Sequence, residues 1–171
     1  MGRYILAHDL GTSGNKAVLY RDDGTLAAGV TVSYETRYPG PGRAEQEPED
    51  WWRAVCASTG QLLEKARVTP GEVACVSFSG QMMGCVLVDR KGTALRPAII
   101  WADTRAAKQE RQMTDALGQK TVYQITGHRI SASYSAAKLL WVKQEEPEVY
   151  AGAYQMLNAK DYIIRRLTAT S

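Results

Sequence analysis

The chain has few of the residues from which metal centres and disulfide frameworks are built. Its 171 residues include three cysteines and two histidines. The cysteines Cys56, Cys75 and Cys85 are odd in number and lack CxxC spacing, which argues against a disulfide framework or a zinc site. Each is expected to be a small buried apolar side chain. His8 and His128 are too few for a histidine metal site, and His8 lies in an apolar run, where a packed role is expected.

Long hydrophobic runs and blocks of like charge are also missing. No stretch approaches the ~20 apolar residues of a membrane span, and the residues after Met1 lead into a predicted strand rather than a signal-peptide core. The net charge of +3 comes from scattered lysines and arginines. We therefore expect a cytoplasmic protein that binds neither nucleic acid nor a membrane.

What is present is typical of one α/β domain with a proper core. Hydrophobic residues make up 44% of the chain and charged residues 23%, and no linker or repeat interrupts it. Short apolar runs bounded by turn formers predict strands, and helical spacing of apolar residues predicts helices. Strands are predicted at residues 4–8, 17–20, 26–34, 73–79, 85–89 and 98–101, and helices between Pro48 and Pro70 and at residues 104–117, 135–145 and 159–167.

The order of these elements predicts a mixed sheet. The first three strands are joined by short turns, which predicts an antiparallel meander. Residues 36–47 are rich in proline and glycine and are expected to form an irregular loop. The helix that begins at Pro48 has one apolar face, which includes Trp52 and Cys56. A strand–helix–strand connection of this kind places residues 73–79 parallel to the strand before the helix.

The connection between the first two strands contains more than a turn requires. Asp9 precedes it, Gly11, Thr12 and Ser13 occupy it, and Lys16 follows it. An ordinary glycine-rich hairpin is one interpretation. The other is a phosphate cradle, in which a row of free backbone N–H groups binds an anion, hydroxyls add donors, and the acid suits Mg²⁺. The GxxxxGK[ST] loop of the P-loop proteins is not present.

Several motifs, taken in order, resemble the FGGY family of carbohydrate kinases, and most closely its xylulokinase type. They are DLGTSGNK, EQEPEDWW, SFSGQMMG, IIWADTR, AAKLLWV and NAKDYIIRRLT, spread over residues 4–168. The resemblance implies an actin-like ATPase (ribonuclease H-like) fold, with an antiparallel meander plus parallel strands and helices on both faces. It also implies that residues 1–171 are part of the N-terminal kinase domain, and that the rest of that domain and the C-terminal domain lie outside the chain.

The resemblance also implies roles for residues around the first hairpin. Asp9 corresponds to the acid that holds Mg²⁺ through water. Gly11, Thr12 and Ser13 correspond to the phosphate loop. Lys16 stands where relatives have a cation that points at the nucleotide phosphates, although a lysine that closes a surface hairpin can equally be solvated.

On the sugar side, Gln81, Met82 and Met83 stand where relatives hold sugar hydroxyls. Xylulokinase-like proteins often have histidine at Met83, and a thioether cannot donate a hydrogen bond. Either the backbone holds the sugar or the sugar differs from xylulose; the alternative is that both methionines fill the core. Asp103 and Arg105 are expected to contact sugar by resemblance, with helix capping as the alternative. Lys138 is expected to be structural.

The function implied is that of an ATP-dependent sugar kinase, which uses Mg·ATP to phosphorylate a hydroxyl of a ketopentose-like sugar, xylulose or a related one. The general base and the adenine-binding domain are expected beyond residue 171, so no catalytic residue is assigned and the chain alone is expected to be inactive. Exposed apolar surface favours a homodimer. The alternatives are an inactive fragment that binds only sugar or a partner, and another ATPase of the actin-like superfamily.

Overall fold

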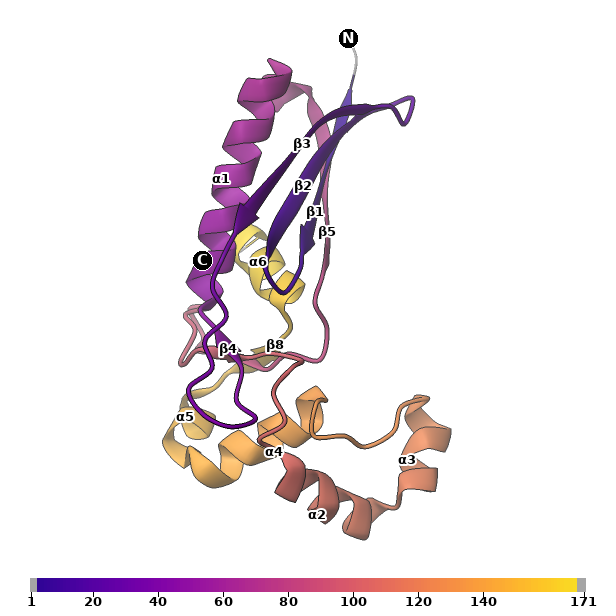
Figure 1. Cartoon of the computed structure of the whole chain (residues 1–171), viewed down its shortest axis with the longest axis vertical. Coiled ribbons are helices and arrows are strands. Elements are labelled where there is room, and N and C mark those ends of the chain that lie inside the picture. The colour runs from indigo at the N-terminus through magenta and orange to yellow at the C-terminus, as the bar shows by residue number, and fades with distance from the viewer. Residues whose placement is uncertain (1–2, 169–171) are drawn as a thin grey trace. The chain divides into compact units, whose positions relative to one another are not determined.

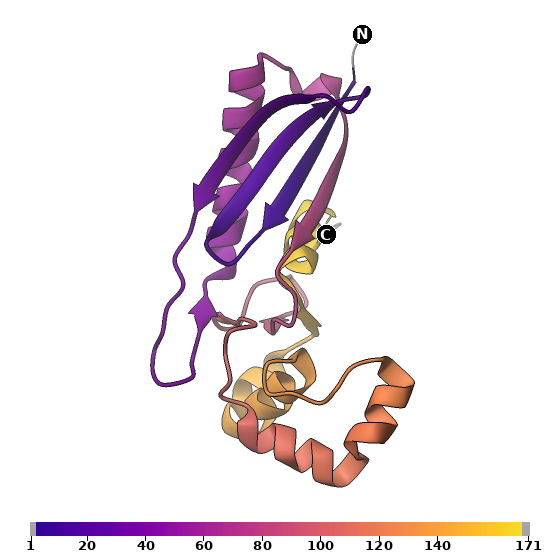
Figure 2. The same ribbon diagram turned by 45° about the vertical axis from the view of Figure 1, so that its right-hand side comes forward.

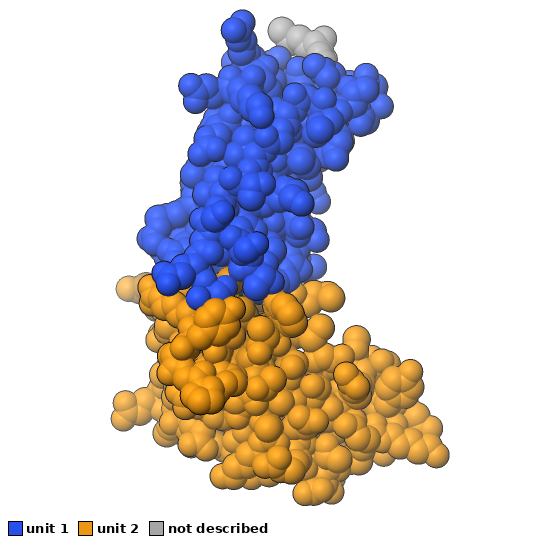
Figure 3. All heavy atoms as spheres, in the orientation of Figure 1, with its two compact units in different colours: residues 1–36, 48–81, 159–170 blue, residues 37–47, 82–158, 171 orange. Residues whose placement is uncertain are grey.

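The computed structural model describes residues 3–168. Met1 and Gly2, at the start of the segment for which no signal peptide was predicted, lie outside the described residues. The chain divides into two compact units, shown in two colours in Figure 3. Of the described residues, unit 1 contains those up to Thr36, Pro48–Gln81 and Ala159–Thr168. Unit 2 contains Arg37–Glu47 and Met82–Asn158. The single domain expected from composition is thus built as two cores.

Unit 1 is built on a four-stranded sheet with the strand order β3-β2-β1-β5 (Figure 1). Strands β1 (Tyr4–Leu10), β2 (Gly14–Arg21) and β3 (Leu26–Ser33) form the predicted antiparallel meander. Strand β5 (Val73–Gly80), which follows the one-turn 3₁₀ helix η1 (Pro70–Glu72), pairs with β1 in parallel. The mixed sheet predicted from the sequence is therefore confirmed.

The helices of unit 1, α1 (Pro48–Ala66) and α6 (Ala159–Thr168), lie on the same face of the sheet (Figure 2). That face contributes Leu6 and Leu19 to a core that Leu62 of α1 completes. Helices on both faces were expected, but the described part of this unit has none on the second face. The alternation of side chains along a strand explains why only one face is uniformly apolar.

The helix α1 begins where the sequence predicts and ends before the predicted stop. Pro48 opens it and two acidic residues occupy its first turn, where they complement the helix dipole. It ends at Ala66 because Arg67 adopts a left-handed φ of 55°, before Pro70 is reached. The inward face carries Trp51 rather than Trp52. The prediction of the buried face was therefore wrong by one residue at this end.

Two of the three cysteines are not the buried side chains that were expected. Cys56 on α1 and Cys75 on β5 are exposed, whereas Cys85 is buried. Burial raises the pKa of the Cys85 thiol to about 11, so it is a neutral apolar group there. Only Cys85 fits the prediction.

Unit 2 combines short strand pairs with helices. Strand β4 (Glu45–Gln46) pairs with β7 (Ala98–Ile99), and β6 (Val86–Val88) pairs with β8 (Gln155–Leu157). The predicted helices appear as α2 (Ala107–Leu117) and α4 (Ser135–Glu145). The sequence did not predict β4, β8, α3 (Gln119–Thr126) or α5 (Pro147–Gly152), because each is too short to show a clear periodicity. Within residues 3–168, no helix combines the length and apolar character needed to cross a membrane.

Candidate functional site

The β1–β2 connection of unit 1 is stabilised largely by its own backbone. The Gly11 amide donates to the carbonyl oxygens of Asp9, at 3.1 Å, and Gly14, at 3.0 Å. The Gly11 N–H is therefore not part of a row of free amides, which corrects that detail of the predicted cradle. Residues 11–13 keep the name phosphate loop for their predicted role, and Ser13 is exposed within it.

The glycine at position 14 is required by close approach of the backbone. A Cβ atom there would lie 2.7 Å from the carbonyl oxygen of Val32 on β3, inside van der Waals contact. Any side chain would push the hairpin away from the third strand. This glycine is thus explained by the sheet itself, without invoking a ligand.

Asp9, Lys16 and Ser79 form a polar row across three strands of the sheet. The register places Asp9 opposite Lys16 on β2 and opposite Ser79 on β5. All three side chains are exposed and line a hollow of about 230 Å³ on the face away from α1. An exposed carboxylate beside an exposed ammonium suits the charges of a magnesium–phosphate group.

Whether this row fits Mg²⁺ depends on the number of ligands the chain must supply. Among residues 3–168, no group of three or more histidine, cysteine, aspartate or glutamate side chains gathers. Magnesium ions that accompany a nucleotide keep several waters and bind one or two carboxylates plus phosphate oxygens. A single carboxylate at Asp9 fits that pattern.

Tyr34, the residue after β3, contacts the phosphate loop. The sequence analysis did not predict this contact. Its hydroxyl donates to the Gly11 carbonyl oxygen at 2.6 Å. Burial, with a smaller contribution from the negative charge of Asp9, raises the pKa of Tyr34, so the phenol keeps its proton. No local pattern could have revealed this bond, because 23 residues separate donor and acceptor.

His8 lies on the opposite face of β1 and is a packed residue, as predicted. It is 2% exposed, stacks on Phe78, and its Nδ1 lies 2.9 Å from the Asn15 amide nitrogen. Asn15 also donates to Ser58 of α1. The expectation that only apolar groups surround His8 is corrected by these partners. Burial lowers the pKa of His8 to about 4.

Of the residues predicted on the sugar side, Gln81 belongs to unit 1 and lies against the phosphate loop. Its backbone amide donates to the Leu10 carbonyl oxygen at 2.8 Å, and its side-chain amide lies 3.4 Å from the Gly11 carbonyl oxygen. These contacts give Gln81 a role beside the loop. A contact with sugar remains a prediction for this residue.

Met82 and Met83 line a cavity in unit 2. Its volume is about 380 Å³, and its lining includes Met82, Met83, Met113, Ile130, Ser131 and Tyr134; we call it the methionine pocket. Met82 is 66% exposed, so it does not fill a core. Met83 has a left-handed φ of 62°, which few residues other than glycine adopt. The backbone turn at Met83 thus determines the shape of one wall.

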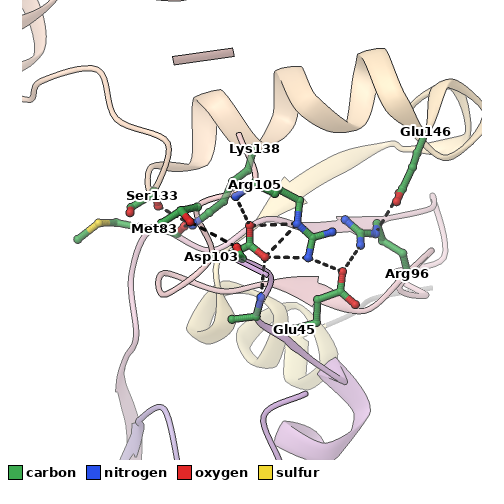
Figure 4. A network of polar contacts seen from close by, with 11 residues as sticks. Glu45, Met83, Arg96, Asp103, Arg105, Ser133, Lys138 and Glu146 are labelled. Atoms are coloured by element: carbon green, nitrogen blue, oxygen red, sulfur yellow. Dashed lines mark hydrogen bonds and ion pairs between the residues drawn. The ribbon is translucent and has the colours of Figure 1, made fainter. Parts of the chain in front are cut away.

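Asp103 and Arg105 are held in an ion-pair network with Glu45 (Figure 4). Asp103 has no exposed surface and accepts hydrogen bonds from the Ala44 amide, at 2.7 Å, and from the Arg105 guanidinium. Arg105 also pairs with Glu45 at 2.7 Å. Their charges are therefore satisfied within the protein. A contact of Asp103 or Arg105 with sugar stays a prediction.

The same network extends to the base of the methionine pocket. Arg96 bridges Glu45 and Glu146, at 2.5 and 3.1 Å. Lys138 of α4 has no exposed surface, and its ammonium donates to the carbonyl oxygens of Met83 and Ser133 (Figure 4). A buried charge surrounded by carbonyl oxygens is a structural arrangement, as predicted for Lys138.

With this geometry established, comparison with known proteins identifies the family. Residues 4–171 match the N-terminal domain of the FGGY family of carbohydrate kinases. The chain belongs to this family. Xylulose kinase from Staphylococcus xylosus is 34% identical to this FGGY chain over 165 residues, which are 96% of the chain and 34% of that protein.

Solved structures of FGGY kinases have the same fold. Gluconate kinase from Lactobacillus acidophilus superposes with a TM-score of 0.89 at 30% identity, covering 97% of this chain and 33% of that one. Ligand-bound xylulose kinase from the same organism gives 0.88 at 30% identity, covering 96% and 33%. The actin-like ATPase fold predicted from the sequence is confirmed. The FGGY chain spans about a third of the length of the relatives it matches.

Proposed function

We propose that this chain is the part of an ATP-dependent sugar kinase that binds the phosphates of Mg·ATP and one side of a sugar. The observation that carries the proposal is the match of residues 4–171 to the N-terminal domain of the FGGY carbohydrate kinases. A protein of this kind is expected to act in the cytoplasm. Its substrate is a small sugar. Xylulose is the first candidate, because the relative from S. xylosus is named a xylulose kinase.

In unit 1 the polar row supports a phosphate-binding role. Asp9 holds Mg²⁺ through its water ligands, and Lys16, opposite it in the sheet, attracts the phosphate oxygens. Thr12 and Ser13 add donors at the end of the hairpin. Mg·ATP, when bound, supplies the phosphoryl group that is transferred, and these residues orient it and offset its charge.

In unit 2 the methionine pocket supports a role in sugar binding. Its volume of about 380 Å³ lies within the usual range of small-molecule sites. Met83 lines the pocket with a thioether, which offers no donor. Side chains that can bond to sugar hydroxyls are also in the lining: Thr126, His128, Arg129, Ser131, Tyr134 and Ser135. The similarity to a gluconate kinase makes an aldonate the second sugar class to examine.

The chain can be tested directly by titration with the two ligand classes. Amide resonances of Thr12 and Ser13 are expected to shift with Mg·ATP and with inorganic triphosphate plus Mg²⁺. Methyl resonances of Met82 and Met83 are expected to shift with xylulose or gluconate. Binding of Mg·ATP away from the hairpin, or of sugar away from the pocket, contradicts the proposal.

A matched pair of variants separates the magnesium role from general charge. Asp9→Asn removes the proposed magnesium partner, whereas Asp22→Asn removes an exposed acid at the turn that follows β2. We expect the Mg²⁺ dependence of phosphate binding to disappear only in Asp9→Asn. Equal behaviour of the two variants assigns the metal role to another group and overturns this part of the proposal.

A further inference from the structure

Lys138 connects two segments that are distant in sequence and that both form the methionine pocket. Its Nζ lies 2.7 Å from the carbonyl oxygen of Met83 and 2.5 Å from that of Ser133. Met83 itself lines the pocket, and Ser133 stands between the lining residues Ser131 and Tyr134. One side chain therefore links the two walls (Figure 4).

The turn at Met83 needs such a connection. Holding a non-glycine residue in the left-handed region costs free energy, so the conformation persists only when surrounding contacts favour it. Ser135, also on α4, donates to the Gly84 carbonyl oxygen at 2.7 Å, and the Gly84 amide donates to Asn158 at 3.1 Å. Of these three contacts, the hydrogen bond from Lys138 is the one made to the carbonyl oxygen of Met83.

A lysine is chemically suited to this position but costly there. The ammonium has three donors and no acceptor, so it can serve two carbonyl oxygens of different segments at once. A hydrogen bond from a charged donor is roughly twice as strong as a neutral one. Complete burial nevertheless disfavours the charge, and a core that needed only volume could use an apolar side chain of similar length.

We propose that Lys138 is the positioning residue of the methionine pocket: its ammonium holds the Met83 turn and the Ser133 segment at the separation that a bound sugar requires. The identity of the ligand rests on the proposed function, whereas the connection between the walls does not. Lys138 contacts the carbonyl oxygens and not the pocket, so it acts through Met83 and Ser133.

The charge on Lys138 can be changed within an accessible pH range. Burial lowers its pKa to about 8, and Arg105 adds to the effect, while Asp103 and the Cys85 thiol oppose it. Above this pH the amine is neutral and its bonds to both carbonyls weaken. The walls of the pocket are therefore expected to respond to pH near 8.

The experiment uses the whole chain with ¹³C-labelled methionine methyl groups. Met82, Met83 and Met113 all line the pocket and report on its walls. Without sugar, we expect the Met83 methyl resonance to titrate with a midpoint near pH 8. Lys138→Met, which keeps the length and removes the donors, abolishes this step. Any step due to His128, which also lines the pocket, persists in that variant.

Lys143→Met is the matched control, because Lys143 lies on the same helix but is exposed. It is expected to keep the titration. With xylulose as the probe, we expect the dissociation constant to rise tenfold or more in Lys138→Met and less than twofold in Lys143→Met. Amide resonances of β6 and β8, which belong to unit 2 and do not line the pocket, show whether each variant remains folded.

Two outcomes separate the inferences. If the Met83 resonance in folded Lys138→Met keeps both its position and its titration, Lys138 does not position the pocket and the inference is overturned. If that titration behaves as expected but neither xylulose nor gluconate shifts any pocket methyl group, the positioning role stands. In that case it is the proposed sugar site that fails.

Discussion

The two units of this chain place polar groups in opposite ways. In unit 1, Asp9, Lys16 and Ser79 lie exposed on regular strands, and the sheet register brings them together. In unit 2, Asp103 and Lys138 are buried, and contacts between segments far apart in sequence bring them to their partners. Exposed polar groups on a rigid sheet are available to a ligand, whereas buried paired charges support the walls around one.

The largest expected effect concerns whether the two units together are enough for catalysis. We expect residues 1–171 alone to give no sugar-dependent release of ADP. Asp9 is proposed to hold magnesium and Asp103 is buried, so neither is expected to act as the general base, which must lie within hydrogen-bond reach of the proton. The chain spans about a third of the length of its relatives, and positioning of two substrates is worth ~7–11 kcal/mol.

A coupled ADP-release assay with xylulose and gluconate checks this, with the xylulose kinase of S. xylosus as the positive control. Sugar-dependent turnover by the 171-residue chain that Asp9→Asn abolishes contradicts the prediction.

In an active kinase that contains this chain, Asp9→Asn is expected to lower kcat, because the magnesium ion would lose the carboxylate that the protein supplies. The loss of transition-state stabilisation is expected to be several kcal/mol. The free energy of unfolding should change little, since Asp9 is exposed. Steady-state kinetics beside urea unfolding distinguish the two effects. A near-normal kcat in Asp9→Asn argues against the magnesium role, and Asp22→Asn serves as the control.

In unit 2 the corresponding change should act on stability. Arg105→Met leaves the buried carboxylate of Asp103 without its guanidinium partner, and loss of one member of a buried pair costs about 3–5 kcal/mol. Urea unfolding measures this loss. Arg111→Met on α2 is the control, because Arg111 is exposed. Equal stability of the two variants means that the network is not energetically important.

The buried histidine of unit 1 predicts sensitivity to acid. Because burial lowers the pKa of His8 from 6.5 to about 4, the unfolded chain takes up a proton first as the pH falls below 6.5. The free energy of unfolding therefore decreases between pH 6.5 and 4, by up to about 3 kcal/mol from this residue. Above pH 6.5 His8 is neutral in both states and contributes no slope.

This dependence is measured as the difference between the parent chain and His8→Gln in urea melts at pH 7 and 4.5. His128→Gln, at an exposed site, is the matched control for the substitution itself. An identical acid slope in the parent and His8→Gln excludes the effect.

The smallest expected effect concerns sugar choice. Met83→His places a donor where a thioether lines the methionine pocket, and a gained or lost hydrogen bond of this kind changes relative kcat/KM by about 1–3 kcal/mol. In a protein that turns over, the ratio between xylulose and other sugars should change while the KM for ATP does not. Unchanged ratios across a sugar panel indicate that Met83 does not face the substrate.

Local sequence patterns predicted unit 1 better than unit 2. The meander, the parallel strand and α1 each have a clear periodicity of 2 or 3.6 residues and clear turn formers at their ends. In unit 2, β4 has two residues and β8 has three, which is too short for any pattern. The errors over Cys56 and Cys75 share one cause, because burial depends on what packs against a residue and not on its neighbours in sequence.

By itself, the sequence determined the strand order of the first hairpins, the start of α1 and the position of the β1–β2 connection. These follow from interactions between residues near one another in the chain, such as Gly11 with Gly14. Only the tertiary structure decided that Asp103 binds the Ala44 amide, 59 residues away, and that Lys138 binds the Met83 carbonyl, 55 residues away. A buried charge must be paired wherever the fold supplies a partner, and that partner is chosen by packing, which no local pattern encodes.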